Sequence, residues 1–124
     1  MEYISEKEFR KQPMEVQQVI FEWWRPSKGD LFENDLIGGF GVITGEKKLK
    51  NGLIPLLTEG QLRKFIEDNI NKKVDIIHYI NEGYILVVDE DIDYSNLGHD
   101  LLQAYWKVAC EIAKEEVVEH GQTK

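Results

Sequence analysis

The segment from Ser95 to Glu119 constrains the fold more than any other part of the chain, because it holds the longest unbroken helical pattern. Two neighbouring stripes of apolar residues run along it at helical spacing. The first stripe consists of Leu101, Tyr105, Val108 and Ile112, and the second of Leu102, Trp106, Ala109 and Ala113. A surface helix normally buries a single stripe. We therefore expect this helix to be covered on two sides, either by its own chain or by a second copy.

Length and composition predict one globular domain over residues 1–124. The 124 residues are 42% hydrophobic and 31% charged, enough to bury a core without disulfides. The single cysteine, Cys110, cannot form an internal disulfide, so a reducing cytoplasm is the expected location. We find no signal segment and no apolar run of roughly 20 residues, which predicts that the chain neither spans a membrane nor is exported.

Negative charge is concentrated in the last third of the chain. Residues 82–124 hold 10 of the 23 acidic residues but only 3 of the 15 basic ones, within a formal net charge of −8. Because an acidic surface repels phosphate at long range, direct nucleic-acid binding is disfavoured. A basic protein is a better-matched partner.

Capping and breaking residues predict two further helical regions. The S-x-x-E spacing of Ser5 and Glu8 predicts a short helix start, and Pro13 suits the first position of a longer helix that Pro26 ends. The apolar face of that helix comprises Val16, Val19, Ile20, Trp23 and Trp24. Thr58 with Gln61 predicts a second capping box. The helix it opens would bury Leu62, Phe65, Ile66 and Ile70.

Strand patterns occupy the intervals between these helices. A loose meander is predicted over Leu31–Glu33, Phe40–Thr44 and Leu53–Leu57, with Gly45–Gly52 as an exposed charged hairpin loop and Pro55 at an edge. The clearest hairpin joins residues 74–80 to residues 84–89 through Asn81-Glu82-Gly83, and its strands are expected to be central. The fold class is therefore α+β: a mainly antiparallel sheet of four to five strands with an N-terminal, a middle and a long C-terminal helix.

The densest acidic segment, DEDIDYSNLGHD, admits two interpretations. Its oxygen-bearing residues Asp89, Asp91, Asp93, Ser95 and Asp100 match the spacing of a calcium loop. Tyr94 stands where that loop needs glycine, and the last ligand is not Glu. The alternative is an acidic strand-to-helix connection in which Asp93, Ser95 or Asn96 caps the helix. We predict no metal, and we keep Asp89, Asp91 and Asp93 as candidate binding residues.

Other reactive residues do not form a catalytic pattern. His78, His99 and His120 are scattered, and neither HExxH nor CxxC occurs. Cys110 is expected to be an inert core residue. The glycines of residues 38–41 lack the lysine and helix of a phosphate loop and are expected to bend a strand. A non-enzymatic protein without a cofactor is the expectation.

Large aromatic residues are the strongest candidates for recognition. Trp23, Trp24 and Arg25 are adjacent at a helix end, and Tyr105 and Trp106 lie in the last helix. Aromatic and arginine side chains dominate binding hot spots. The alternative is that these aromatics are core or dimer contacts.

Three stretches carry a resemblance to a known group of proteins: WWRPSKGD (23–30), IPLLTEGQLRKFIED (54–68) and YSNLGHDLLQAYWKVACEIAKE (94–115). In them the chain resembles a family of small accessory proteins carried by phages and prophages of Gram-positive bacteria. The resemblance implies a genomic context and the cytoplasm of the host, and such proteins often act by binding, including binding to host immune machinery.

The leading hypothesis is a non-enzymatic accessory protein, as a homodimer, that binds and inhibits or modulates a host or phage protein. The first alternative is a small-ligand or nucleotide binder with a pocket between sheet and helix, using Arg25, Arg63 and Lys64. The second alternative is a metal-dependent hydrolase.

Overall fold

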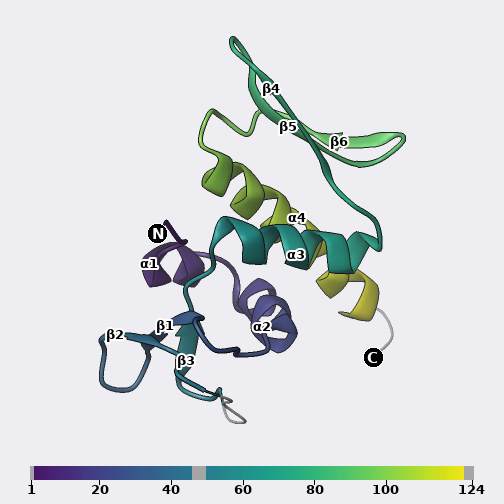
Figure 1. The fold of residues 1–124 in the computed structure, drawn as a ribbon. Coiled ribbons are helices and arrows are strands. Elements are labelled where there is room, and N and C mark those ends of the chain that lie inside the picture. Colours follow the sequence, from purple (N-terminus) through teal and green to yellow (C-terminus); the bar gives the residue numbers. More distant parts are fainter. Residues whose placement is uncertain (1, 46–49, 122–124) are drawn as a thin grey trace.

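The chain folds as an α+β protein in which two three-stranded antiparallel sheets lie on opposite sides of a layer of helices (Figure 1). The computed structural model describes residues 2–45 and 50–121, with the backbone alone for 118–121. In chain order the elements are α1 (Glu6–Arg10), α2 (Met14–Trp23), β1 (Leu31–Asn34), β2 (Phe40–Val42), β3 (Leu53–Pro55), α3 (Glu59–Ile70), β4 (Asp75–Tyr79), β5 (Gly83–Asp89), β6 (Ile92–Tyr94) and α4 (Leu101–Gly121). The prediction of one sheet of four to five strands was wrong, because the strands divide into two sheets.

Helix α4 is the central element of the core. It contacts α2, α3 and β5, so its own chain covers it on two sides. Both predicted stripes are buried except for Leu101, which is half-buried, and Ala104 and Cys110 are buried beside them. The two apolar stripes thus correctly predicted that this helix is covered on two sides. The covering elements belong to the same chain.

Caps define the helix starts as the spacing predicted. The Ser5 side chain accepts the Glu8 N–H at 3.2 Å at the start of α1. Thr58 and Gln61 form a reciprocal capping box at the start of α3. Pro13 differs slightly from expectation, since it is the residue before α2 rather than the first helical residue.

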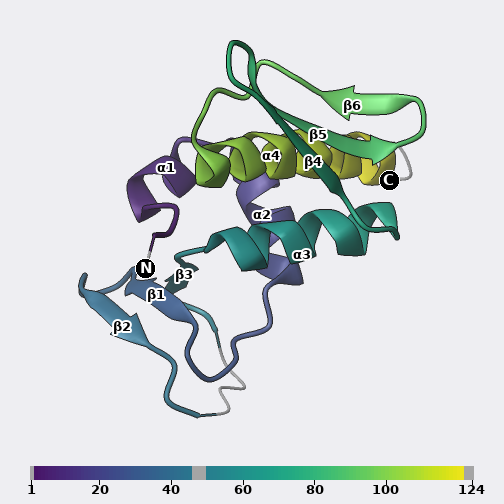
Figure 2. The ribbon, with the colours of Figure 1, turned by 45° about the horizontal axis from the view of Figure 1, so that its top comes forward.

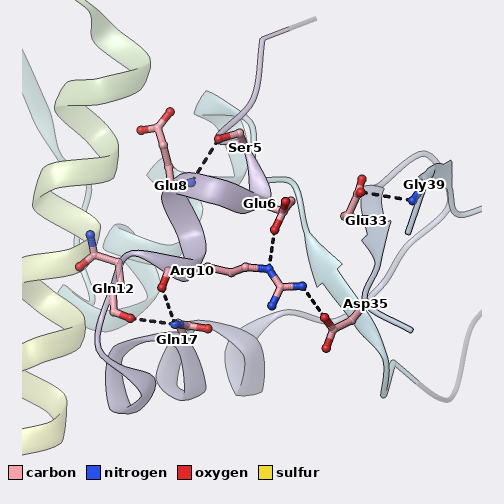
Figure 3. A network of polar contacts seen from close by, with 9 residues as sticks. All are labelled: Ser5, Glu6, Glu8, Arg10, Gln12, Gln17, Glu33, Asp35 and Gly39. Carbon is pink, nitrogen blue, oxygen red and sulfur yellow. Dashed lines mark hydrogen bonds and ion pairs between the residues drawn. The ribbon is translucent and has the colours of Figure 1, made fainter. Parts of the chain in front are cut away.

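Polar side chains join the N-terminal helices to each other and to the first sheet (Figure 3). Arg10 pairs with Glu6 in its own helix and with Asp35 in the turn after β1. Gln17 of α2 donates to the carbonyl oxygen of Gln12 at 2.7 Å and to that of Arg10 at 3.2 Å. These contacts link α1 to the start of α2 and to the turn after β1.

The first sheet has the order β2-β1-β3, so β3 pairs with β1 and not with β2. The predicted meander was therefore wrong in its connectivity, and Gly45–Gly52 does not close a hairpin between neighbouring strands. Residues 46–49 of that predicted loop lie outside the described residues. Pro55 is in an edge strand, as predicted, where its missing N–H costs no ladder bond.

Lys50 connects this sheet to α2. Its Nζ donates to the carbonyl oxygens of Phe21 at 2.5 Å and Trp24 at 2.6 Å, at the C-terminal end of the helix. Desolvation lowers the pKa of Lys50. A cation there interacts favourably with the helix dipole. Lys50 was expected in an exposed loop, but it is half-buried and has a structural role.

Glu67 fastens the end of α3 to the start of β4. Its Oε2 accepts the Val74 N–H at 2.9 Å and the Arg63 Nε at 3.2 Å, and Lys73 lies 3.7 Å from Oε1. Desolvation pushes the pKa of Glu67 upward, but these donors outweigh it, and the pKa lies below its usual value. The junction therefore favours the charged carboxylate.

The second sheet has the order β4-β5-β6 and lies across α4. The predicted β4–β5 hairpin is present, with Gly83 at φ 90°. Two expectations were wrong: β4 is a mostly exposed edge strand rather than a central one, and the acidic segment forms a third strand, β6. After β6, Asp100 caps α4 by accepting the Gln103 N–H at 2.9 Å, in place of the three caps proposed from sequence.

Candidate functional site

The second sheet has one side against α4 and one side that faces away from the helices (Figure 2). Strand alternation assigns the side chains to these two sides. The side against the core carries Ile76, Tyr84, Leu86 and Tyr94. The opposite side carries Ile77, Tyr79, Ile85 and Val87. Ile77 is 40% exposed and Tyr79 is 49% exposed, so this second side presents an apolar strip to solvent.

Two carboxylates flank one end of this strip. Register places Asp75 of β4 opposite Val87, and Val87 opposite Asp93 of β6. Asp75 and Asp93 are both exposed, and they lie on the same side of the sheet as Val87. We call the four apolar residues with Asp75 and Asp93 the outer face. A partner that combines apolar and cationic side chains would match it.

Sequence reasoning found Asp93 but not the rest of the outer face. The sequence did contain a signal for this face. Alternate residues of a strand lie on one side of a sheet, and a short turn fixes which residues of the next strand lie opposite them. Residues 75, 77 and 79 therefore share a side with residues 85 and 87. The patch was overlooked because both strands were expected to be covered.

The predicted acidic binding residues lie along the β5–β6 hairpin without converging. Asp89 pairs with Lys72 at 2.7 Å, and this contact, with the Glu90 N–H, lowers the pKa of Asp89. Asp91 is exposed in the turn, and Asp93 is in β6. Across residues 2–45 and 50–121, no group of three or more His, Cys, Asp or Glu is placed to hold a metal ion. The segment that matched a calcium loop forms the β5–β6 turn, strand β6 and the loop before α4.

A cavity lies between the second sheet and the helices α3 and α4. Its volume is about 660 Å³, and Ile70, Ile92 and Ile112 contribute to its lining. The remaining residues are mostly polar, with the carboxylates of Asp89, Glu111, Glu115 and Glu116 beside Lys72 and Lys114. A pocket between sheet and helix was predicted, but its lining is acidic rather than basic and aromatic. Such a lining disfavours a phosphate-bearing ligand.

Trp23 and Arg25, predicted to bind, line a second cavity of about 500 Å³ with Lys64 and Asp68. The Trp23 Nε1 donates to the Asp68 Oδ2 at 2.9 Å. That hydrogen bond is the main cause of the lowered pKa of Asp68. Trp24 also touches this cavity, but its side chain is 1% exposed and belongs to the core.

The charges around the Trp23 cavity nearly cancel. Its basic residues are Arg25 and Lys64, and its acidic residues are Glu22, Asp30 and Asp68. Arg63, which the nucleotide hypothesis placed with them, instead donates to Glu67 and to the carbonyl oxygen of Val74.

Tyr105 and Trp106 are core residues. They are 3% and 4% exposed, and the Trp106 ring lies 6.3 Å from that of Phe9. Of the two interpretations of these aromatics, the structure supports the core contact.

His78 and His99, which are distant in sequence, lie together. The His78 Nε2 is 3.1 Å from the His99 Nδ1, and the His78 ring packs against Tyr84 in a tilted arrangement with 4.3 Å between centroids. The cause is the bridge between Gly83 and Gly98, which brings the loop before α4 alongside β5. Because that bridge has no sequence signal, the meeting of this pair was not predicted from the sequence. The side chain of His120 lies outside the described residues.

Cys110 and the glycine-rich segment behave as structural features. Cys110 is a free, buried cysteine, and burial raises the pKa of its thiol to about 12. Gly38 and Gly39 adopt positive φ in the connection between β1 and β2. The segment is thus a turn between paired strands.

None of the described helices has both the length and the apolar character needed to cross a membrane. Comparisons with protein-family models, with curated proteins and with solved structures found no match to this chain.

Proposed function

We propose that this protein is a non-enzymatic accessory protein of a phage or prophage that binds a host or phage protein and inhibits or modulates it. The observation that most supports this proposal is the outer face, an exposed apolar strip with a carboxylate on each side of Val87. Exposed apolar strips rimmed by polar residues are typical of protein-binding sites. The resemblance to phage proteins adds the genomic context, the host cytoplasm and host immune machinery as a class of target.

Charge specifies the chemistry of the partner. Asp75 and Asp93 lie at one end of the strip, and Asp91 and Glu90 continue the negative charge into the β5–β6 turn. A protein segment with lysine or arginine next to aliphatic or aromatic residues would match both parts of the surface. An acidic segment would be repelled.

Selection from a random peptide library on the immobilised protein tests this proposal directly. We expect enriched peptides to combine basic and apolar residues. We also expect Tyr79→Ala to weaken their binding about tenfold through loss of an aromatic contact. Asp93→Asn should weaken binding less and should reduce its dependence on salt. Fluorescence anisotropy with a labelled selected peptide measures both effects.

The turn between β1 and β2 provides a matched control for Tyr79→Ala. Leu36 is an apolar residue in this turn, at 83% exposure, and Leu36→Ala should leave peptide binding unchanged. Enrichment of acidic peptides, or equal binding by Tyr79→Ala, would refute the assignment of the outer face. In the host, expression of the wild-type protein should alter phage growth and expression of Tyr79→Ala should not.

A small-ligand binder is the second candidate, supported by the cavity beside Trp23. Its volume of about 500 Å³ is in the range of ligand pockets, and it holds one aromatic side chain beside Arg25 and Lys64. Because Glu22, Asp30 and Asp68 are also there, a zwitterionic ligand fits this charge balance better than a nucleotide. A thermal-shift screen separates the candidates, since a ligand of the native state raises the melting temperature. A shift that Trp23→Ala abolishes would favour this candidate.

The homodimer is part of the first proposal. Helix α4 needs no second copy, because its own chain covers it. Support for a dimer comes instead from the edge of the second sheet.

A further inference from the structure

The two edges of the second sheet differ in how they are protected. Strand β6 has three residues, carries Asp93, and follows a register shift between Val87 and Asp89. Short length, charge and irregular pairing are the features by which proteins block edge-to-edge association. Strand β4 has five residues, Asp75–Tyr79, pairs regularly with β5, and has one carboxylate, Asp75, at its first position and no lysine, arginine or proline. It is the less protected edge.

The side chains along β4 reinforce this difference. Ile77 and Tyr79 are 40% and 49% exposed, and Ile80, at the start of the turn, is 87% exposed. Among the described residues, β5 is the one strand that pairs with β4. An exposed apolar strand with an open edge favours addition of another strand.

Backbone directions show which residues can form that pairing. Tyr84 donates its N–H to the carbonyl oxygen of Gly98 at 2.8 Å, on the side of β5 away from β4. Tyr84 and His78, which is opposite it in β4, are therefore a non-hydrogen-bonded pair. It follows that the N–H and C=O of His78, and by the two-residue repeat those of Ile76, point toward the open edge.

We propose that β4 pairs with β4 of a second copy of this chain, antiparallel and with His78 opposite His78. The proposal specifies the contact of the homodimer proposed above and rests on it. The two three-stranded sheets become one six-stranded sheet about a two-fold axis, and the two outer faces become continuous. Such an interface is isologous and closed, so association stops at the dimer.

The side chains are self-complementary in this register. Ile77 of each copy lies opposite Tyr79 of the other. Ile76 and Asp75 extend toward Ile80 and Asn81 of the other copy, which lie in the turn after β4, so no two carboxylates meet across the axis. Moving the axis to Ile77 would instead place Asp75 opposite Tyr79 and would leave the exposed Ile80 opposite the buried Val74. The register centred on His78 therefore matches apolar residues with apolar residues.

Solution mass and one backbone substitution test the pairing. An interface built mainly on one strand is small, so we expect the wild type to pass from monomer to dimer over roughly a hundredfold range of concentration. His78→Pro removes the N–H that points to the open edge and leaves the bonds to β5 intact. It should weaken dimerisation roughly tenfold or more. His78→Ala keeps that N–H and should dimerise like the wild type. Analytical ultracentrifugation measures the dissociation constants, and circular dichroism checks the fold.

Cross-linking gives a readout of the register. In the proposed pairing, the two Cα atoms of residue 78 are about 5.5 Å apart, within reach of a disulfide. Those of residue 77 are offset by two positions and lie beyond the limit of about 7 Å. His78→Cys should therefore form an intermolecular disulfide much faster than Ile77→Cys. Cys110 is buried and does not compete.

The outcomes separate this inference from the proposal on which it rests. A wild type that stays monomeric throughout overturns both the homodimer and its contact. A dimer that survives in folded His78→Pro, or that Phe40→Asp at the exposed edge of the first sheet disrupts instead, overturns the β4 contact and leaves the homodimer standing. If His78→Pro fails to fold, cross-linking decides: a disulfide that forms no faster in His78→Cys than in Ile77→Cys refutes the register. None of these results depends on peptide binding to the outer face.

Discussion

Cys110 is a residue whose chemistry follows from its position in α4. It is 5% exposed and surrounded by core residues, and desolvation raises the pKa of its thiol to about 12. A thiol that stays protonated at neutral pH is a poor nucleophile and a poor metal ligand. The expectation from sequence that Cys110 is a small hydrophobic core residue is in accord with this environment.

The raised pKa predicts a loss of stability at alkaline pH. The thiol of an unfolded chain ionises near pH 8.5, and that of the folded chain near 12. The contribution of the protonated Cys110 thiol to the free energy of unfolding is complete below about pH 8.5. It is lost as the pH rises toward the folded pKa, by about 1.4 kcal/mol per pH unit. Urea denaturation between about pH 8 and pH 11 should therefore show a steeper decline for the wild type than for Cys110→Ala. Tyr94 and Tyr105 also have raised pKa values, but both proteins share them. Equal slopes would contradict the prediction.

Glu67 predicts the opposite behaviour in acid. Because its folded pKa lies below the unfolded value, its contribution is present above about pH 4.3 and is lost as the pH falls through the folded pKa. Glu67→Gln should cost about 1–2 kcal/mol at neutral pH, since hydrogen bonds to charged groups are strong. It should also flatten the acid limb of the stability curve, as measured by urea denaturation across pH.

Glu111 supplies the control for Glu67. It pairs with Lys114 at 3.3 Å, and both side chains are about half exposed. Solvent screens such pairs, so Glu111→Gln should change stability by less than about 0.5 kcal/mol. A larger effect at Glu111 than at Glu67 would show that the α3–β4 junction is not the stronger anchor.

Among the elements, the contact between β5 and the loop before α4 depends on two glycines. Gly83 and Gly98 both have positive φ and form a parallel bridge. A Cβ at Gly83 would overlap the carbonyl of Gly98, whereas a Cβ at Gly98 would meet nothing closer than Lys107 Nζ at 4.0 Å. The same substitution at the two positions therefore has different consequences.

We predict that Gly98→Ala costs about 1 kcal/mol for its backbone conformation alone. Gly83→Ala should cost about 2 kcal/mol more, because the backbone must also move apart. Urea denaturation measures the two free energies of unfolding. A nuclear magnetic resonance contact between the His78 and His99 rings should persist in Gly98→Ala and disappear in Gly83→Ala. Equal costs at the two glycines would contradict the close approach.

The helices and the β4–β5 hairpin could each be predicted from the sequence, but the pairing of the other strands could not. The capping pairs at Ser5 and Thr58, and the turn at Gly83, act over a few residues and are visible locally. The pairing of β3 with β1 is not local, because β2 is nearer to β3 in sequence and yet does not pair with it. Ile54 of β3 and Leu57 just after it are buried in the core.

The whole molecule has a helical centre with a sheet at each side. Helix α4 contacts α2 and α3, and the second sheet contacts α4 through β5. Trp23 of α2 contacts Asp68 and Phe65 of α3. The first sheet joins this centre through fewer anchors, among them Ile54, Leu57 and Lys50. The first sheet should therefore be less stable than the helical centre and the second sheet.

Hydrogen exchange should reveal that difference. We expect amides of α3, α4 and β5 to exchange through global unfolding, and those of β1 and β2 to exchange faster through a local opening. Mass spectrometry of native-state exchange against denaturant measures both classes. Lys50→Met should accelerate exchange in the first sheet while leaving α4 unchanged. Uniform protection across all elements would show that the first sheet is no weaker than the core.

Local sequence pattern was sufficient to predict the burial of α4, the capped starts of α1 and α3, the β4–β5 hairpin and the acidic character of the segment that follows this hairpin. These features follow from periodicity and from interactions within a few residues of the chain. The division into two sheets, the role of Lys50, the meeting of His78 with His99 and the openness of the β4 edge were set by long-range packing. A strand pattern states that a segment will pair and which side it buries, but the choice of neighbour depends on which segments the folded core brings within hydrogen-bonding distance.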